Sequence, residues 1–382
     1  MTDSPAKTGP LAGIMVIELA GIGPGPYAGQ LLADMGADVV VIDRPGRSLP
    51  KAVDGRGKKS IVLDLKKPEA VDALLKLVAK ADVLIEGLRP GVTERMGVGP
   101  DACHTINPGL IYGRMTGWGQ SGPWSQMAGH DINYISMTGV LNAIGKEGQP
   151  PVPPLNMVGD FGGGSMFLVT GILAALIERG RTGKGNVVDA AIIDGTHSLM
   201  SFVHGMAGVG QWQTKRESNL LDGAAPFYRC YMTADGKFMA VGCIEPQFFA
   251  AMMERLPIDA EAFGAQLDFG AWAKQHEMLE DVFATKTRDE WEAIFAGTDA
   301  CVTPVLDYVE AASHPANAER QAVVQDGRWL HPQIAPRLAT QPLATHFEIA
   351  TKGGDYAAIL AEAGFGESDI SQLIAAGAVI AN

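Results

Sequence analysis

The sequence predicts an α/β fold, with a large Rossmann-like domain built on a parallel sheet and a smaller α+β domain. The first observation is that short apolar strands alternate with helical segments from residue 14 to 115, which is typical of a parallel sheet with helices on both faces. The second is that a chain of 382 residues with 47% hydrophobic content can form two or three domains. The third is a hairpin signal near residue 235, which we expect to open the smaller domain.

Strands and helices alternate through the first half of the chain. Residues 14–19 and 38–43 flank a Gly/Pro turn and a helix, and so predict a βαβ unit. Further strands are expected at 58–65, 82–88, 109–115 and 185–194, and helices at 68–80 and 130–141. The run at 166–177 is largely apolar but holds only twelve residues. It is too short to cross a bilayer and predicts a buried helix.

The second half of the chain predicts the smaller domain. A long helix and connector are expected over 196–225, and a β-hairpin over 230–244 around Ala234-Asp235-Gly236. Helices follow to about residue 297, and the tail from 355 to 380 returns to a helical period. The predicted domains are a large one at 1–195 and 330–382, a linker helix at 196–225, and a small domain at 226–329.

The composition argues against several classes of protein. A net charge of −13 argues against general nucleic-acid binding, because phosphate backbones demand a basic surface. The four cysteines form no CxxC pair, which indicates neither a disulfide framework nor a zinc knuckle. The ends show neither a secretory leader nor a peroxisomal signal, so we expect a soluble cytoplasmic protein without membrane insertion.

A glycine-rich turn follows the first strand. Residues 23–28 satisfy G-x-G-x-x-A, and Asp43 ends the next strand at the spacing of a dinucleotide fingerprint. That fingerprint binds pyrophosphate through backbone N–H groups, and Pro24 and Pro26 each remove one. The alternative is that the glycines only turn the chain and let the helix pack on the strand. We therefore predict no nicotinamide cofactor.

A basic segment, residues 44–67, carries eight Lys and Arg against two acids. In an acidic chain this is a candidate site for a phosphorylated ligand, because Lys and Arg give charge-assisted hydrogen bonds to phosphate. A solvated loop is the alternative. Arg89 and Arg95 follow a later strand and would extend the patch at the same sheet edge, where open α/β sheets bind ligands.

Three residues are candidates for acid–base chemistry, and each has a structural alternative. His130 meets the first turn of a predicted helix, where it is either a base or a structural histidine. Asp160 precedes three glycines that let a ligand approach the backbone, or else it is an N-cap. Glu245 follows an apolar strand, either as the partner of a base or as the end of that strand.

Metal and thiol chemistry are not indicated. His197 and His204 share a predicted helix, but two histidines without a third ligand make a poor metal site. Cys243 lies on an apolar strand without an electropositive neighbour, so it is expected in the core. We predict no metal.

Four motifs taken together resemble one family. They are GHDINY, VGDFGGGS, AVGCIEPQF and the opening VIELAGIGPGPYAGQLLADMGADVVVIDRP. The sequence resembles the α-methylacyl-CoA racemases, a branch of the family III CoA-transferase group, from about Pro10 to the C-terminal helix. The resemblance implies an interlocked homodimer with a CoA-binding large domain and a small domain that completes the partner's active site.

The resemblance also implies site residues. The catalytic His and Asp of the family match His130 and Asp160, and the Glu that pairs with the His matches Glu245. No cofactor is implied, because CoA is part of the thioester substrate. The implied CoA contacts are Arg44, Leu63, Asp64, Leu65, Lys66, Gly87, Leu88, Arg89, Arg95, Gly129, Asp131 and Tyr134.

The implied activity interconverts (R)- and (S)-2-methylacyl-CoA thioesters by 1,1-proton transfer through an enolate. This chemistry needs two bases that flank the α-carbon, one protonated while the other is not, and His130 and Asp160 suit it. Amide N–H groups at the start of the helix at His130 and Asp131 would stabilise the enolate. The alternatives are a family III CoA-transferase with Asp160 as nucleophile and a non-catalytic CoA-binding module.

Overall fold

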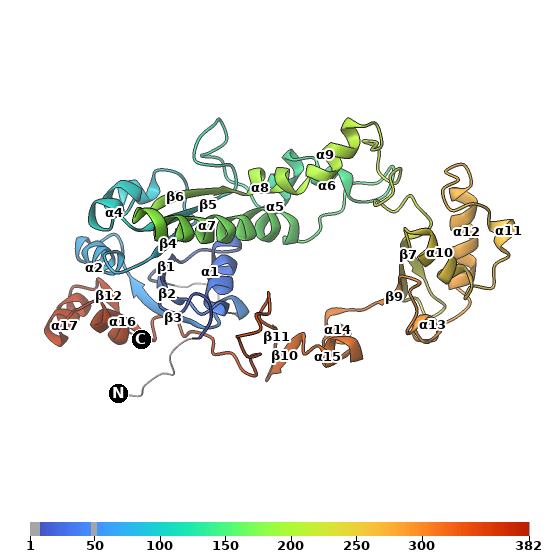
Figure 1. Cartoon of the computed structure of the whole chain (residues 1–382). Helices are drawn as coiled ribbons and strands as arrows, with labels where there is room; N and C mark the ends of the chain where they lie inside the picture. Colours follow the sequence, from blue (N-terminus) through green and yellow to red (C-terminus); the bar gives the residue numbers. More distant parts are fainter. Residues whose placement is uncertain (1–7, 47–51, 382) are drawn as a thin grey trace. The chain divides into compact units, whose positions relative to one another are not determined.

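The computed structural model (Figure 1) describes residues 8–46 and 52–381, and in it the chain divides into two compact units. The first runs to Thr138, resumes over Leu155–Leu199 and returns from Ala318 onward; the second comprises Gly139–Pro154 and Met200–Asn317. The second unit thus takes in residues 139–154, which the sequence assigned to the large domain. One reason is that the Arg216 guanidinium donates hydrogen bonds to the backbone carbonyls of Asn142, Lys146 and Gln149.

The first unit is built on a seven-stranded sheet in the order β12-β3-β2-β1-β4-β5-β6. Six strands are parallel: β1 Met15–Leu19, β2 Asp38–Asp43, β3 Lys58–Leu63, β4 Val83–Glu86, β5 Ile111–Thr116 and β6 Asn186–Ala191. The predicted parallel sheet is confirmed. The chain ends with β12, Val379–Ile380, which pairs antiparallel with β3 after the turn at Gly377. The sequence missed this strand and predicted only helix in the tail.

Helices cover both faces of the sheet. In β1, the adjacent side chains of Val16 and Ile17 enter separate hydrophobic cores because successive residues of a strand point to opposite faces. One core is closed by α1 Pro24–Asp34 and α7 Met166–Thr182. The other is closed by α2 Pro68–Val78, α4 Pro100–Ile106, α16 Tyr356–Glu362 and α17 Glu367–Ala375. The predicted α/β class is therefore confirmed.

The apolar helix α7 buries one face only. It follows directly on a π-helical segment, η2, Met157–Ser165, and packs against β5 and β6 (Figure 1). Leu168 and Ile172 are fully buried, whereas Met166 and Ile177 are exposed, so the expectation of a buried helix holds for half its surface. By length and composition Met157–Thr182 is apolar enough to cross a membrane, a test that core helices of soluble proteins also pass.

Two helices predicted as continuous are each divided into shorter helices. The one expected at 130–141 divides into α5 Asp131–Met137 and α6 Val140–Ala143 because Gly139 adopts a left-handed conformation (φ 86°). The expectation of a long helix over 196–225 is wrong. Instead, α8 Ile192–Leu199 and α9 Ser201–Gly208 are short, and Gly210 with φ 74° ends the helical run.

The second unit contains the predicted hairpin. Strands β7 Tyr228–Met232 and β8 Phe238–Gly242 are antiparallel, and β9 Val302–Val305 adds a third strand beside β8. The helices α10 Pro246–Met253, α11 Ala260–Phe263, α12 Trp272–Phe283, α13 Arg288–Phe295 and α14 Tyr308–Ser313 belong to this unit. Short elements elsewhere are η1 Val53–Gly55, α3 Val92–Arg95, α15 Pro315–Glu319, β10 Val323–Asp326 and β11 Trp329–Pro332.

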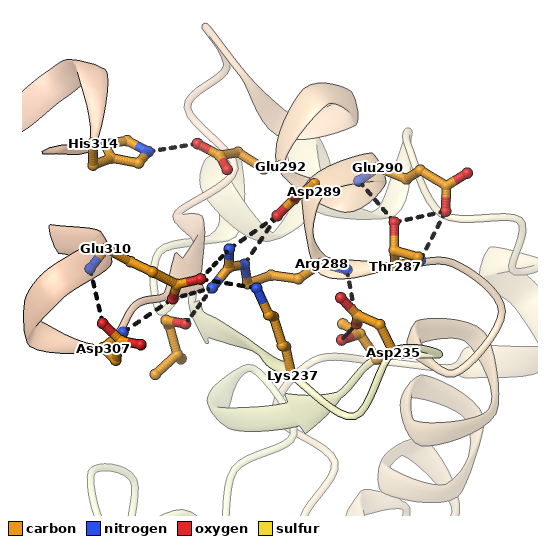
Figure 2. A network of polar contacts seen from close by, with 12 residues as sticks. Asp235, Lys237, Thr287, Arg288, Asp289, Glu290, Glu292, Asp307, Glu310 and His314 are labelled. Carbon is orange, nitrogen blue, oxygen red and sulfur yellow. Dashed lines mark hydrogen bonds and ion pairs between the residues drawn. The ribbon is translucent and has the colours of Figure 1, made fainter.

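A polar network ties the hairpin turn of this unit to α13 and α14 (Figure 2). The buried Arg288 guanidinium donates hydrogen bonds to Glu310 and Asp289. Lys237, in the turn between β7 and β8, also donates to Glu310. Asp235 of the turn accepts from the Arg288 amide. The two cations lower the pKa of Glu310 to about 2. The network therefore holds elements distant in sequence together and remains charged at any ordinary pH.

Two cations of the basic segment are buried in the first unit. Arg56 is 1% exposed and donates from Nε and Nη2 to Asp34 at 3.0 and 2.6 Å, and from Nη1 to the Pro332 carbonyl. Lys58 donates to Glu18 at 2.7 Å and to the Pro26 carbonyl at 2.8 Å. These side chains stabilise the fold and are not available to a phosphorylated ligand.

We expect Arg56→Leu to lower the free energy of unfolding by about 3–5 kcal/mol, because it leaves the Asp34 carboxylate buried without its partner. Lys59→Leu is the matched control. Its ammonium pairs with Asp38 and Glu362 at 3.2 Å while its side chain is 30% exposed, so its removal should cost less than about 1 kcal/mol. Urea unfolding of both variants measures the difference, and equal losses would contradict the prediction.

Candidate active site

A cleft of about 650 Å³ lies at the carboxyl edge of the parallel sheet in the first unit. Its walls come from the segments that follow four strands: residues 20–26 after β1, Arg44 after β2, 87–90 after β4 and 117–118 after β5. Further lining residues come from 125–130, Tyr134, Asn156, Asp160 and Ile192. A parallel sheet brings the carboxyl ends of its strands to one edge, where open α/β folds bind their ligands.

An aromatic cluster forms one wall of the cleft. The Trp118 ring meets Trp124 and Tyr134 edge-on, with centroids 4.9 and 4.8 Å away. Tyr134 is held so tightly between Gly117 and Gly129 that a Cβ at either position would lie 2.0 or 2.7 Å from its ring. Both glycines are therefore required for packing, and the Tyr134 hydroxyl donates back to the Gly129 carbonyl.

His130 stands immediately before α5 and lines the cleft with its side chain exposed. Its backbone is extended (φ −131°), and its amide donates to Asn133 Oδ1 at 3.1 Å while its carbonyl accepts from the Asn133 and Tyr134 amides. The helix start thus fixes the His130 backbone and leaves the imidazole facing the cleft.

Asp160 lines the same cleft from η2. Burial is the main reason that its pKa is raised, and the charge of Asp131 raises it further, while Asn156 and His130 act in the opposite direction. The Asn156 amide lies 3.5 Å from Asp160 Oδ2. The sequence did not single out Asn156, which lies outside the quoted motifs.

Two of the three glycines that follow Phe161, Gly163 and Gly164, are enclosed by neighbouring elements. A Cβ on Gly163 would lie 2.4 Å from Thr196 Oγ1, and one on Gly164 would crowd Ile192 and Pro24. Neither glycine lines the cleft. These glycines instead allow η2 to pack closely against α8 and the start of α1.

Asp131 is also placed differently from its expected role. It was expected among the CoA contacts, but it is 7% exposed and does not line the cleft. Its carboxylate turns toward η2, where Oδ1 accepts from the Asp160 amide at 2.7 Å. The backbone of Asp131 begins α5, whereas its side chain belongs to the wall behind the site.

The remaining expected ligand contacts divide into two groups. Arg44, Gly87, Leu88, Arg89, Gly129 and Tyr134 line the cleft. Leu63, Asp64, Leu65, Lys66 and Arg95 do not, although the end of β3 neighbours Arg44 across the sheet edge. Leu63 is fully buried in the core, and Arg95 reaches toward Gly91, one residue beyond the lining residue Pro90.

The loop with Leu88 and Arg89 is shaped by a buried acid that the sequence analysis missed. Glu86, 1% exposed at the end of β4, accepts from the Leu88 amide at 2.6 Å and from Arg114 Nε at 3.0 Å. Burial raises the pKa of Glu86 to about 7, although the Leu88 amide and Arg114 both lower it. The sequence did carry a signal for Glu86, because an acidic residue ends an otherwise apolar strand.

Among the cations of the basic segment that the structure describes, Arg44 alone lines the cleft, together with Arg89 from outside the segment. Arg47 and Lys51 fall outside the described residues. The expectation that the segment forms one phosphate site is therefore wrong in part, because Arg56 and Lys58 are consumed by buried ion pairs.

Glu245 belongs to the second unit, where it is exposed and precedes α10. The cleft lining comes from the first unit alone. Within residues 8–46 and 52–381, no group of three His, Cys, Asp or Glu side chains is placed to hold a metal ion.

Comparison with known proteins gives a consistent result. Residues 11–348 match the family model described as CoA-transferase family III. An α-methylacyl-CoA racemase of Mus musculus is 46% identical over 95% of this chain and 96% of its own length, and one of Homo sapiens is 44% identical over the same shares. The crystal structure of a CAIB/BAIF family protein from Brucella suis superposes with a TM-score of 0.81 at 25% identity, covering 93% of this chain and 99% of that one.

We expect Arg44→Ala and Arg89→Ala each to weaken CoA binding about tenfold, because each removes a charge-assisted hydrogen bond to phosphate. Arg181→Ala is the control, since this arginine lies in the last turn of α7 and not in the cleft. It should change the dissociation constant less than about twofold. Isothermal titration calorimetry with CoA measures all three, and a uniform loss would mean that only the overall charge matters.

Proposed function

The chain belongs to CoA-transferase family III, and from that membership we propose that it is a racemase that interconverts (R)- and (S)-2-methylacyl-CoA thioesters. The observation that carries the proposal is that His130 and Asp160 line one cleft from different segments of the chain. The likeness to α-methylacyl-CoA racemases over 95% of the chain supports the same function.

The reaction needs one proton removed and one returned on opposite faces of the α-carbon. In one direction neutral His130 takes the α-proton, the C–H electron pair moves toward the thioester oxygen to form an enolate, and the Asp160 carboxyl group protonates the other face. In the reverse direction ionised Asp160 is the base and protonated His130 the acid. Each residue ends in the state that the opposite direction requires.

The environment of Asp160 favours this exchange of roles. An ordinary carboxyl group is a much weaker base than an imidazole, with reference pKa values of about 3.9 and 6.5. Burial and the neighbouring Asp131 raise the pKa of Asp160, which brings its basicity closer to that of an imidazole. A closer match between the basicities of the carboxylate and the imidazole lowers the barrier in the direction that uses Asp160 as base.

The enolate needs hydrogen-bond donors that are fixed before it forms. Of the two amides expected to supply them, that of His130 already donates to Asn133 Oδ1. We therefore assign this role to the Asp131 amide, at the first position of α5. We propose no further cofactor, because CoA arrives as part of the substrate and the acid–base steps need none.

A homodimer completes the proposal. The first unit exposes apolar side chains along η2, α7, β6 and α8: Met157, Met166, Ile177, Val187 and Leu199. Exposed apolar surface of this extent is typical of subunit interfaces. From its likeness to the α-methylacyl-CoA racemases, we propose that Glu245 of the partner subunit pairs with His130.

The function is tested by incubation with one epimer of a 2-methylacyl-CoA in deuterated water. The wild type should form the other epimer with deuterium at the α-carbon. Asp160→Asn should lower the rate of epimerisation at least about a thousandfold. His130 should still exchange the proton on its own face with retained configuration. His130→Ala should show the mirror pattern. Mass spectrometry and chiral chromatography measure both.

Glu245→Gln is the graded control, because it removes a partner of the base and not the base itself. It should retain more activity than either variant of the bases. A family III CoA-transferase gives the opposite set of results. The wild type then incorporates no α-deuterium, hydroxylamine traps an acyl group on Asp160, and His130→Ala has little effect.

The dimer is tested on the exposed face of α7. Ile177 is 68% exposed, and a charge buried there in an interface would be costly, so Ile177→Glu should raise the dimer dissociation constant about tenfold or more. Ile106→Glu is the control on α4, at the opposite face of the sheet, where the side chain is 43% exposed. Analytical ultracentrifugation measures both, and a monomeric wild type that remains fully active would rule the dimer out.

A further inference from the structure

One side chain physically links the two proposed bases. Asp131 follows His130 directly and begins α5, and its carboxylate Oδ1 accepts a hydrogen bond from the Asp160 amide at 2.7 Å. This hydrogen bond joins the helix start that carries His130 directly to the η2 segment that carries Asp160.

The contact is enclosed. Asp131 is 7% exposed, and a Cβ on Gly159 would lie 2.3 Å from its Oδ1 and 2.9 Å from its Cγ. Glycine is thus required at the position before Asp160 so that the carboxylate can approach the η2 backbone. The second oxygen, Oδ2, is buried and has no hydrogen-bond partner. A buried carboxylate that is only partly satisfied is costly, which points to a function beyond packing.

The charge of Asp131 acts on Asp160 at short range. It raises the pKa of Asp160, next to the larger effect of burial, while His130 lowers it. The pKa of Asp131 is itself raised by burial, against the Gly159 and Asp160 amides.

The other elements packed against η2 contribute little charge at this point. Tyr134 of α5 is the further titratable group that senses Asp160. Gly23 lies beside Asp160 just before α1, and Tyr27 of α1 packs against Phe161. The helix α8 carries the exposed Asp194 and His197, and Glu178, Arg179 and Arg181 lie near the far end of α7. On β5 and β6, Arg114 is engaged by Glu86 and Glu94, and Asp189 accepts from the Gln120 amide.

We propose that Asp131 is a positioning residue whose carboxylate holds the Asp160 backbone at a fixed place relative to His130 and whose negative charge makes Asp160 a stronger base. The inference rests on the proposed racemase function. It gives the Asp131 carboxylate, which does not line the cleft, a role separate from the CoA contact expected of this residue. In the proposed function the amide of the same residue binds the enolate, while its carboxylate binds the Asp160 backbone.

Asp131→Asn separates charge from shape, because the Asn side chain keeps an oxygen that can accept from the Asp160 amide. Losing the charge lowers the pKa of Asp160, so Asp160 stays ionised to lower pH. The acid limb of the pH profile of kcat/KM, which reports on the pair of bases, should therefore shift to lower pH. kcat should fall about tenfold, since a weaker base removes the α-proton more slowly. The fall should be equal in both directions because the equilibrium constant between the epimers is unchanged, while KM and the affinity for CoA stay within about twofold.

Asp194→Asn is the matched control. It makes the same chemical change in the first turn of α8, on an exposed carboxylate, and should leave both the acid limb and kcat unchanged. Asp131→Ser provides a second neutral variant with a shorter oxygen acceptor, and should show the same acid shift with a larger loss of kcat. Melting curves of all variants confirm that they are folded.

Each outcome has a distinct meaning. A higher KM with kcat unchanged would make Asp131 a CoA contact and overturn the proposal. A lower kcat with the acid limb in place in both neutral variants would leave a structural role only and would overturn it as well. Failure of the wild type to incorporate α-deuterium would remove the proposed function instead, whatever the variants do.

Discussion

The close backbone contact between η2 and α8 determines where Asp160 stands. A Cβ on Gly195 would lie 1.9 Å from the Gly163 carbonyl oxygen, and one on Gly163 would collide with Thr196. Only a pair of glycines allows two helical backbones to approach this closely. The other side of η2 meets α1, where Ser165 donates to the Pro24 carbonyl at 2.7 Å. The segment that carries Asp160 is therefore held on two sides before any ligand contact is made.

The structural cations lie at the amino end of β3, whereas the cations that face the cleft follow the carboxyl ends of strands. Arg56 and Lys58 are drawn into the core by Asp34 and Glu18, because a buried carboxylate requires a partner. Arg44 and Arg89 follow strand ends instead and remain exposed at the cleft. An acidic chain can thus bind an anionic ligand with a small local surplus of positive charge.

Sequence reasoning succeeded where a local pattern determines the structure. The apolar runs of the six parallel strands and the Ala234-Asp235-Gly236 turn were sufficient because burial and turn chemistry act over a few residues. The motifs also identified His130 and Asp160, which line one cleft. The sequence could not show that the Asp131 side chain points away from the cleft, or that Arg56 pairs with Asp34. Those outcomes depend on contacts between segments distant in the chain. The strand β12 was missed for the same reason, since Val379 gains its place from β3.

The two proposed bases occupy unequal environments, and the reaction explains why they should. The two epimers of a thioester are close in energy, so a racemase must run both directions from one site. The pKa of a carboxyl group must be raised toward that of an imidazole by burial and by a neighbouring negative charge. His130 is exposed at a helix start, and Asp160 is partly buried beside Asp131. A nucleophilic carboxylate would gain nothing from a paired base across the cleft. The asymmetry of burial therefore favours proton transfer between two faces over acyl transfer to one.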